Sequence, residues 1–263
     1  MMKKKLYRLF VELSNSPVHS LILKKFTQSK LSKPITKSFV KTYKINEEEM
    51  EYPLEQYESL QQLFIRRLKS GARPIDVDSK AVVSPVDGIL AKVGQITSES
   101  SFFVKGQDYS LEEMLGSKED AVKYKGGMFY LFYLSPSHYH RIHSPVNGEI
   151  EKQWQLGSRS YPVNQSGLKY GKRPLSRNYR LISEVKVDSS HVAIVKVGAL
   201  NVNSIHTTHE TNHLEKGEEM AYFSFGSTVI LLFEEGMIES DVKEVPAEMT
   251  VGSRIATLHS NGL

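Results

Sequence analysis

Residues 128–134 read MFYLFYL, and they form the longest uncharged apolar run in the chain. The run is far shorter than the roughly 18 residues that a membrane-spanning helix needs, and its aromatic content favours a buried β-strand. Further strand-like segments surround it at residues 82–83, 89–93, 149–154, 181–187, 192–197, 229–233 and 254–258. Turn-forming Gly, Pro, Asn and Ser separate these segments. The sequence therefore predicts a β-rich core.

The composition of the 263-residue chain is that of a globular protein, with 40% hydrophobic and 24% charged residues. This balance excludes a disordered chain, a collagen-like repeat and a coiled coil. The sequence contains no cysteine. Disulfide bonds, thiolate metal sites and cysteine nucleophiles are therefore excluded.

Positive charge is concentrated at the N-terminus. Residues 1–46 contain eleven Lys or Arg and one acid, so they carry +10, and the rest of the chain carries −6 to give the net +4. Apolar residues recur there at helical spacing: Leu6, Leu9, Phe10 and Leu13, then Val18, Leu21, Ile22 and Phe26. Such basic amphipathic helices favour an anionic membrane surface, although their apolar faces could instead pack on the body. Nucleic acid is disfavoured because the region has few aromatic residues and no known module.

We predict an α+β fold with two parts. Residues 1–46 form an arm of amphipathic helices, the third of them within residues 32–43. Residues 47–263 form a compact β-rich body, sandwich or barrel-like, which begins with a helix at residues 56–69 and contains another at residues 111–115.

One short motif occurs twice. Residues 84–88 read SPVDG, and residues 144–148 read SPVNG, sixty positions later. Each copy precedes a strand-like segment and has the chemistry of a turn, so the pattern predicts a duplicated β-hairpin. The copies differ at one charged position, since Asp87 corresponds to the neutral Asn147. A carboxylate kept in only one copy makes Asp87 a candidate catalytic group.

Three histidines follow the apolar run closely. His138, His140 and His143 lie within six residues. In an extended segment His138 and His140 face one side, and such a pair can bind zinc. Acid–base catalysis and a purely structural role are equally compatible with this cluster.

A possible nucleophile lies just before the strand-like segment 229–233. Residues 225–228 read FGST, and Ser227 could combine with His143 and Asp87 in a Ser-His-Asp arrangement. Because Gly226 tolerates unusual backbone conformations, its carbonyl could also be attacked by the Ser227 hydroxyl. The resulting ester could eliminate, releasing the upstream chain and leaving a pyruvoyl group at position 227. The residues alone leave four readings open: this self-processing, a serine hydrolase, a zinc hydrolase using the histidine cluster with Asp87, and a membrane-binding module without activity.

Six segments taken together resemble the phosphatidylserine decarboxylases of the bacterial and mitochondrial type, which carry a pyruvoyl prosthetic group. The matching segments follow the family order: 66–75 (RRLKSGARPI), 84–88 (SPVDG), 105–116 (KGQDYSLEEMLG), 138–148 (HYHRIHSPVNG), 161–164 (YPVN) and 216–228 (KGEEMAYFSFGST). The chain departs from the family at a few positions. Phe225 replaces a Leu, Tyr179 replaces a Glu, and Asn203 and Ala221 replace Gly.

The resemblance implies how the chain matures. Asp87 would orient His143, and His143 would take the proton of Ser227. The Ser227 oxygen would then attack the Gly226 carbonyl, and elimination would give a β chain of residues 1–226 and an α chain of residues 227–263.

The resemblance also implies the reaction of the mature protein. The amine of phosphatidylserine would form a Schiff base with the pyruvoyl group, carbon dioxide would leave, and His140 is the candidate proton donor. Hydrolysis would release phosphatidylethanolamine, without a metal. The expected partners are phosphatidylserine, an anionic membrane and the chain's own two halves as a heterodimer, with a higher homo-oligomer possible and no nucleic acid. The expected location is peripheral, on the cytoplasmic face of the cell membrane.

Overall fold

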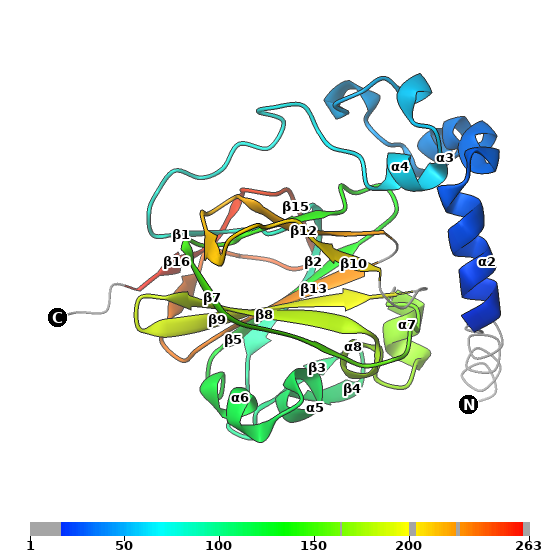
Figure 1. Ribbon diagram of the computed structural model, residues 1–263. Helices are drawn as coiled ribbons and strands as arrows, with labels where there is room; N and C mark the ends of the chain where they lie inside the picture. Colours follow the sequence, from blue (N-terminus) through cyan, green and yellow to red (C-terminus); the bar gives the residue numbers. More distant parts are fainter. Residues whose placement is uncertain (1–16, 164, 200–203, 225–226, 260–263) are drawn as a thin grey trace.

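A computed structural model describes residues 17–163, 165–199, 204–224 and 227–259 (Figure 1). The chain begins with short helices and continues mostly as antiparallel strands, so the predicted α+β class is confirmed. The N-terminal helical region contains α2 (Pro17–Gln28), η1 (Lys30–Ile35), α3 (Thr36–Tyr43), η2 (Glu47–Glu49), η3 (Leu54–Gln56) and α4 (Leu60–Phe64). The predicted helix at Leu6–Leu13 lies outside the described residues. No helix in the described part is both long and apolar enough to cross a membrane.

The helix predicted at residues 56–69 is much shorter than expected. Ser59 caps its start by accepting a hydrogen bond from the Gln62 amide, and the helix ends at Phe64. Beyond it, Leu68 forms a β-bridge with Met50. The apolar spacing therefore continues past the end of the helix because the later residues pack in an extended segment.

An eight-stranded antiparallel sheet forms the centre of the body. Its order is β11-β7-β8-β9-β13-β5-β2-β15. The bounds are β2 (Gly88–Gln95), β5 (Met128–Leu134), β7 (Gly148–Leu156), β8 (Arg180–Val187), β9 (Ser190–Gly198), β11 (His213–Leu214), β13 (Ser227–Phe233) and β15 (Ala247–Met249). The MFYLFYL run is β5, next to the central strand β13. Tyr130 and Phe132 pack on one face and Phe129 and Leu131 on the other, which explains why the run is apolar throughout.

Two hydrophobic cores lie on opposite faces of this sheet. Two three-stranded sheets cover one face: β1 (Ala81–Val83), β16 (Arg254–Leu258) and β14 (Ile238–Ser240), and β10 (Ile205–Thr207), β12 (Glu219–Phe223) and β6 (Arg141–His143). The other face carries β3 (Ser101–Val104), β4 (Gln107–Ser110), α5 (Leu111–Leu115), α6 (Lys118–Lys123), α7 (Gln165–Tyr170) and α8 (Pro174–Arg177). In the described residues the sheets stay open, so a closed barrel is not formed.

The predicted duplicated hairpin is wrong. Strand β1 pairs with β16, whereas β2 pairs with β5 and β15; likewise β6 pairs with β12, whereas β7 pairs with β8 and β11. Each motif is a corner that carries the chain from a small sheet to the large one. In both corners the serine hydroxyl donates to a carbonyl two residues on, Ser84 to Val86 at 2.8 Å and Ser144 to Val146 at 2.7 Å.

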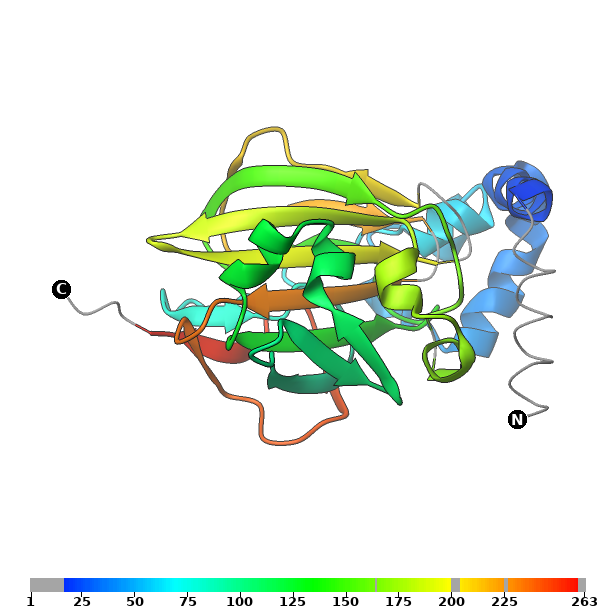
Figure 2. The same cartoon turned by 90° about the horizontal axis from the view of Figure 1, so that it is seen from below.

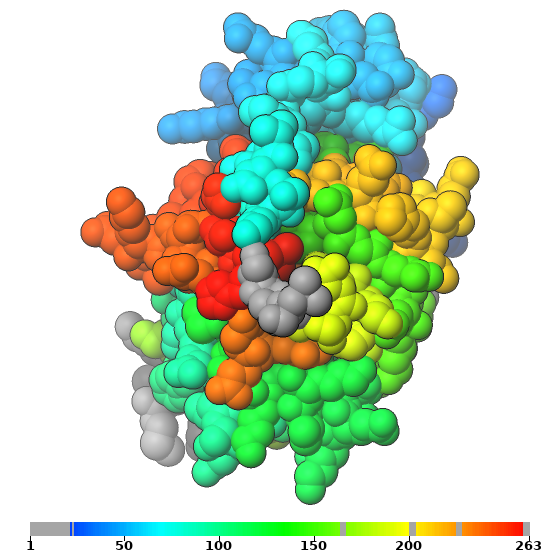
Figure 3. All heavy atoms as spheres, turned by 90° about the vertical axis from the view of Figure 1, so that its left-hand side faces the viewer, coloured from blue at the N-terminus to red at the C-terminus, as the bar shows by residue number. Residues whose placement is uncertain are grey.

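The N-terminal helical region lies beyond one end of the large sheet's strands, and β13 begins at that end (Figure 2). Figure 3 shows the region as a cap on the body, joined to it by the segment that leads to β1. The region has its own small cluster, which includes Val40, Met50, Tyr57 and Leu63. This packing joins the helices before position 46 to the residues that follow it.

Candidate active site

Residue 227 is the first residue of the central strand β13. Its backbone pairs with Leu134 of β5 on one side and Gly198 of β9 on the other. Gly88 begins β2, the strand on the other side of β5 from β13. It packs so closely on β5 that a Cβ atom on Gly88 would lie 2.8 Å from the Tyr133 carbonyl oxygen. Two strand spacings therefore separate residue 227 from the Asp87–Gly88 corner, about 10 Å. Phe225, Gly226 and the side chain of Ser227 lie outside the described residues.

His143 is in the second corner, at the end of β6. Its backbone N–H donates to the Pro85 carbonyl at 2.8 Å, which places it against the corner that contains Asp87. Its Nδ1 donates to the Gly217 carbonyl at 2.8 Å, and its Nε2 lies 3.3 Å from the Tyr139 hydroxyl. Burial lowers the pKa of His143 below its usual value of 6.5. The ring is therefore neutral with its lone pair on Nε2, the form that a general base needs.

Asp87 is buried beside this histidine but binds another group. Arg73 donates to both of its oxygens at 2.6–3.0 Å, and the Val251 amide donates to Oδ1 at 2.9 Å. Arg73 also pairs with Glu49 at 2.9 Å. Burial opposes the charge of Arg73, but the hydrogen bonds and charges of the two carboxylates outweigh burial and raise its pKa. The structure thus brings Asp87 and His143 together without a direct hydrogen bond, and the Gly217 carbonyl holds the imidazole instead.

His140 is fully buried just before β6, the strand that ends at His143. Its Nδ1 donates to the His138 carbonyl at 2.8 Å, and its ring packs against Phe64 of α4 at a centroid distance of 3.9 Å, tilted by 35°. Burial, with the nearby charge of Arg66, holds the pKa of His140 well below 6.5. Its Nε2 is buried and has no hydrogen-bond partner among the described residues. His140 is therefore a neutral imidazole with a free acceptor.

The three histidines do not converge on a metal site. Nδ1 of His138 accepts from the Ser135 amide at 2.9 Å, and its Nε2 donates to Glu248 at 2.9 Å. In the part of the chain that the structure describes, no three His, Asp or Glu side chains lie close enough together to hold a metal. The geometry gives no support to the zinc hydrolase reading.

Sequence reasoning missed the groups that hold the site in place. Arg73 fixes Asp87, and Arg66 donates to the carbonyls of Ser137 and His138 at 2.9 and 3.2 Å. Burial lowers the pKa of Arg66 to about 10, so it remains charged at neutral pH. Both arginines lie in the RRLKSGARPI segment at residues 66–75. The only hint in the sequence is that this segment combines several basic residues with the turn residues Gly71 and Pro74. Nothing in the sequence shows that Gly217 presents its carbonyl to His143.

Comparison with known proteins identifies the class. The profile of the phosphatidylserine decarboxylase family matches residues 60–257. A phosphatidylserine decarboxylase proenzyme of Geobacillus sp. (strain WCH70) is 57% identical over 258 residues, 98% of this chain and 100% of its own. A proenzyme of the same description from Halalkalibacterium halodurans is 53% identical over 97% of this chain and 99% of its own. The chain therefore belongs to the phosphatidylserine decarboxylase family.

Members of this family are lyases that decarboxylate phosphatidylserine. They use a pyruvoyl group that the proenzyme forms by cleaving itself. The reaction and the cofactor predicted from the sequence are confirmed at this level.

Proposed function

We propose that the chain cleaves itself between Gly226 and Ser227 and then decarboxylates phosphatidylserine with a pyruvoyl group at position 227. The observation that carries this proposal is the position of Ser227. It opens a strand that is paired on both sides, at the end of the sheet that contains the buried His140, the half-buried His143 and a fixed carboxylate. The same end faces the basic helical region (Figure 2).

His143 acts as the base in the first stage. Its Nε2 accepts the proton of the Ser227 hydroxyl, and the Ser227 oxygen attacks the Gly226 carbonyl carbon. The Gly226–Ser227 amide breaks as an ester forms. Elimination of that ester leaves a carboxylate on Gly226 and a dehydroalanine at position 227. Water then replaces ammonia there and completes the pyruvoyl group.

Asp87 acts as a positioning residue in this stage. Arg73 and the Val251 amide fix its carboxylate, and its negative charge raises the pKa of His143 against the larger effect of burial. The carboxylate therefore favours the imidazolium that forms when His143 accepts the proton.

The residues present fit a small keto group at position 227. Gly198 lies directly opposite and has no side chain to compete for the space, and β13 keeps both of its neighbours when the preceding bond is cut. The pyruvoyl carbonyl, when formed, supplies the electron sink that loss of carbon dioxide requires. His140 offers Nε2 near the same corner, where it can accept a proton that the substrate ammonium group releases and deliver it to the carbon that has lost carbon dioxide.

The helical region offers a surface for the bilayer that contains the substrate. Exposed apolar side chains lie on it: Ile22, Phe26, Leu31, Ile35 and Tyr43. A pocket of about 560 Å³ beside them is lined in part by Lys30, Lys33 and Lys37. Lys30 and Lys33 share the Glu58 carboxylate at 3.0 and 2.6 Å, and an uncompensated lysine that faces anionic lipid contributes about 1 kcal/mol of attraction. The protein then acts as a peripheral enzyme on the cytoplasmic face, and Phe64 connects this region to His140.

Intact mass under denaturing conditions tests the proposal. We expect freshly purified protein to give two species, residues 1–226 and residues 227–263, the second resistant to Edman degradation because its N-terminus is blocked. The Ser227→Ala variant should remain one species of 29.8 kDa. A single uncut wild-type species, or a small fragment with a free serine amine, would contradict self-processing; the first of these would favour a serine hydrolase.

A further inference from the structure

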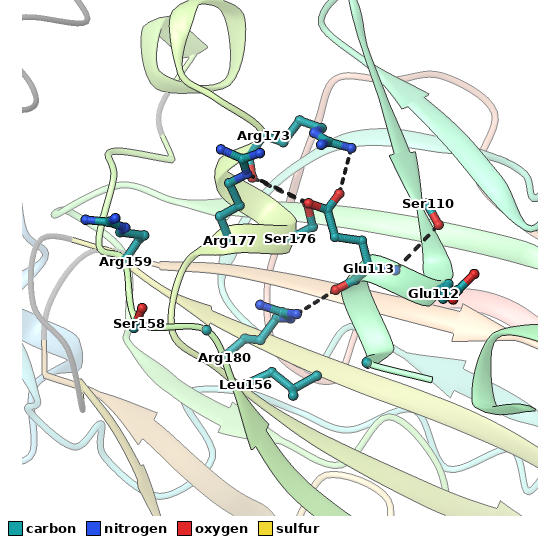
Figure 4. A pocket seen from close by; sticks show the side chains of 12 residues that line it. Ser110, Glu112, Glu113, Leu156, Ser158, Arg159, Arg173, Ser176, Arg177 and Arg180 are labelled. Carbon is teal, nitrogen blue, oxygen red and sulfur yellow. Dashed lines mark hydrogen bonds and ion pairs between the residues drawn. The ribbon is translucent and has the colours of Figure 1, made fainter. Parts of the chain in front are cut away.

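A second site lies away from the histidines, on the helix-covered face of the large sheet. It is a cavity of about 740 Å³ between α5, α8 and the loop after β7 (Figure 4). Four arginines line it: Arg159, Arg173, Arg177 and Arg180. The proposed reaction uses none of them.

The floor of this cavity is a fixed positive charge. Arg180 is buried and donates from its three nitrogens to the carbonyls of Met114, Asn178 and Glu113 at 2.6–3.0 Å. Burial lowers the pKa of Arg180 to about 10, so the side chain is still protonated at neutral pH. Main-chain carbonyls orient this guanidinium but carry no negative charge to neutralise it.

The remaining charges of the cavity do not balance either. One carboxylate, that of Glu113, serves two arginines, with Arg173 at 2.8 Å and Arg177 at 3.8 Å. Arg159 is exposed and forms no ion pair with the described residues. Figure 4 shows Glu112 on the far side of α5 from Arg159, so it does not compensate that charge. The cavity therefore keeps an excess of positive charge.

We propose that this cavity binds a phosphate-bearing anion. Guanidinium groups present paired N–H donors that match phosphate oxygens, and several arginines at a cavity of this size are typical of phosphate recognition. A phosphate would give Arg159 the anionic partner that it lacks. It would also supply a second anion for Arg173 and Arg177, which otherwise share the Glu113 carboxylate.

This site is distinct from the reacting headgroup. The Tyr179 amide donates to the Arg159 carbonyl, the Gly198 amide donates to the Tyr179 carbonyl, and Gly198 pairs with Ser227. Three strand spacings therefore separate the Arg159 backbone from the backbone of residue 227, about 14 Å, and the Arg159 side chain lines the cavity beside α5 and α8. That distance exceeds the length of a serine phosphate headgroup. The separation rests on the proposed role of Ser227, but the anion site itself does not.

The phosphate could belong to a second lipid headgroup or to a soluble molecule. Titration of the purified full chain with inorganic phosphate, followed by calorimetry, tests the shared chemistry, with acetate at equal ionic strength for comparison. Flotation with phosphatidylcholine vesicles, with and without phosphatidic acid, tests the lipid source. The variant is Arg159→Gln/Arg177→Gln, and the matched control is Lys125→Gln, an exposed cation near the start of β5 at the opposite end of the sheet.

We expect wild type and Lys125→Gln to bind phosphate in preference to acetate, and the double variant to bind it at least tenfold more weakly. If the double variant also loses the added affinity for phosphatidic acid, the ligand is a lipid headgroup; if only the phosphate affinity falls, it is a soluble molecule. Equal phosphate affinity in the double variant and wild type, an equal loss in Lys125→Gln, or no preference over acetate would overturn the proposal. Thermal unfolding of each variant confirms that it is folded. Self-cleavage is not part of the readout, so failure of the proposed maturation would not affect the result.

Discussion

An ion pair with the half-buried Arg73 determines the position of the buried Asp87 carboxylate. The side chains of Arg73 and Asp87 are only 16% and 7% exposed, and they meet at 2.6 Å. Removing one partner of such a pair leaves a buried charge without compensation, which costs far more than losing an exposed pair. Arg73 is therefore as important to this corner as Asp87 itself.

The Arg73→Gln variant measures this dependence. We expect the free energy of unfolding to fall by about 3 kcal/mol in urea denaturation, because Asp87 is left charged and unpaired. Self-cleavage should slow in the folded variant because the carboxylate no longer has a fixed position. The control is Arg254→Gln, whose ion pairs with Asp78 and Asp241 are exposed; its change should stay within about 1 kcal/mol. Similar losses in the two variants would contradict a special role for Arg73.

Burial of a neutral His140 makes stability depend on pH. The folded-state pKa lies well below 6.5 because of burial, so the unfolded chain binds a proton at a pH where the folded protein does not. The contribution of neutral His140 to the free energy of unfolding is complete above the pKa of this histidine in the unfolded chain. It decreases as the pH falls through about 6.5.

We expect the urea midpoint of unfolding to drop between about pH 7.5 and about pH 5.5, and His140→Phe to show a smaller drop. Phenylalanine keeps the ring contact with Phe64 but cannot take up a proton in the unfolded state. His143 titrates in both proteins, with the same sign, so it does not account for a difference between them. Equal acid sensitivity in the two proteins would show that His140 is not the group responsible.

At the scale of elements, the strands that fill a core were predictable from the sequence. Residues 128–134 and 229–233 have continuous apolar side chains because both faces of the sheet are covered. Residues 192–197 are apolar for the same reason except at Lys196, whose Nζ donates to the Ser183 hydroxyl at 2.7 Å. The short strands β6 and β12 were not recognised, since three to five partly polar residues show no clear period. Their position depends on partners far along the chain, which no local pattern records.

The corners show the same limit. The two SPV motifs were found in the sequence, and their turn chemistry is real, but the hairpin expected from it does not form. Whether two flanking strands pair with each other depends on which neighbours compete for their edges. Here β16 pairs with β1 and β5 pairs with β2, and both partners come from other parts of the chain.

The candidate site was predictable in its residue types but not in its contacts. Asp87, His143 and the backbone of residue 227 lie at one end of the large sheet, and their roles in catalysis stay predictions. The pairing of Asp87 with Arg73 could not be read from the sequence, because any of several nearby cations could reach that carboxylate. The carbonyl of Gly217 could not be predicted either, since every residue has one.

The helical region supports a prediction about membrane binding. Leu31 is 78% exposed among lysines, and we expect Leu31→Glu to weaken binding to anionic vesicles about tenfold, because it removes apolar insertion and adds repulsion. The control is Val77→Glu, a valine that is 96% exposed in the segment leading to the body. Co-sedimentation with phosphatidylglycerol vesicles compares the two. An equal effect of both changes would mean that net charge, and not this surface, determines binding.

For the whole molecule, the position of β13 predicts the fate of the cleaved chain. The strand is paired along its full length with both β5 and β9, and its side chains contribute to both cores. Residues 227–263 should therefore co-elute with residues 1–226 in native size-exclusion chromatography and separate only in denaturant. Recovery of the small chain alone from native buffer would contradict this arrangement.

The central place of β13 also limits how the cofactor can be supplied. A dissociable cofactor can be lost, replaced or shared among protein molecules, but under the proposed maturation the cofactor is part of residue 227, whose strand is held in the middle of a sheet. Each polypeptide therefore has one opportunity to make it. Chemical damage at that position would be permanent, and restoring activity would require a newly translated chain, so the active lifetime of each protein molecule would end with its cofactor.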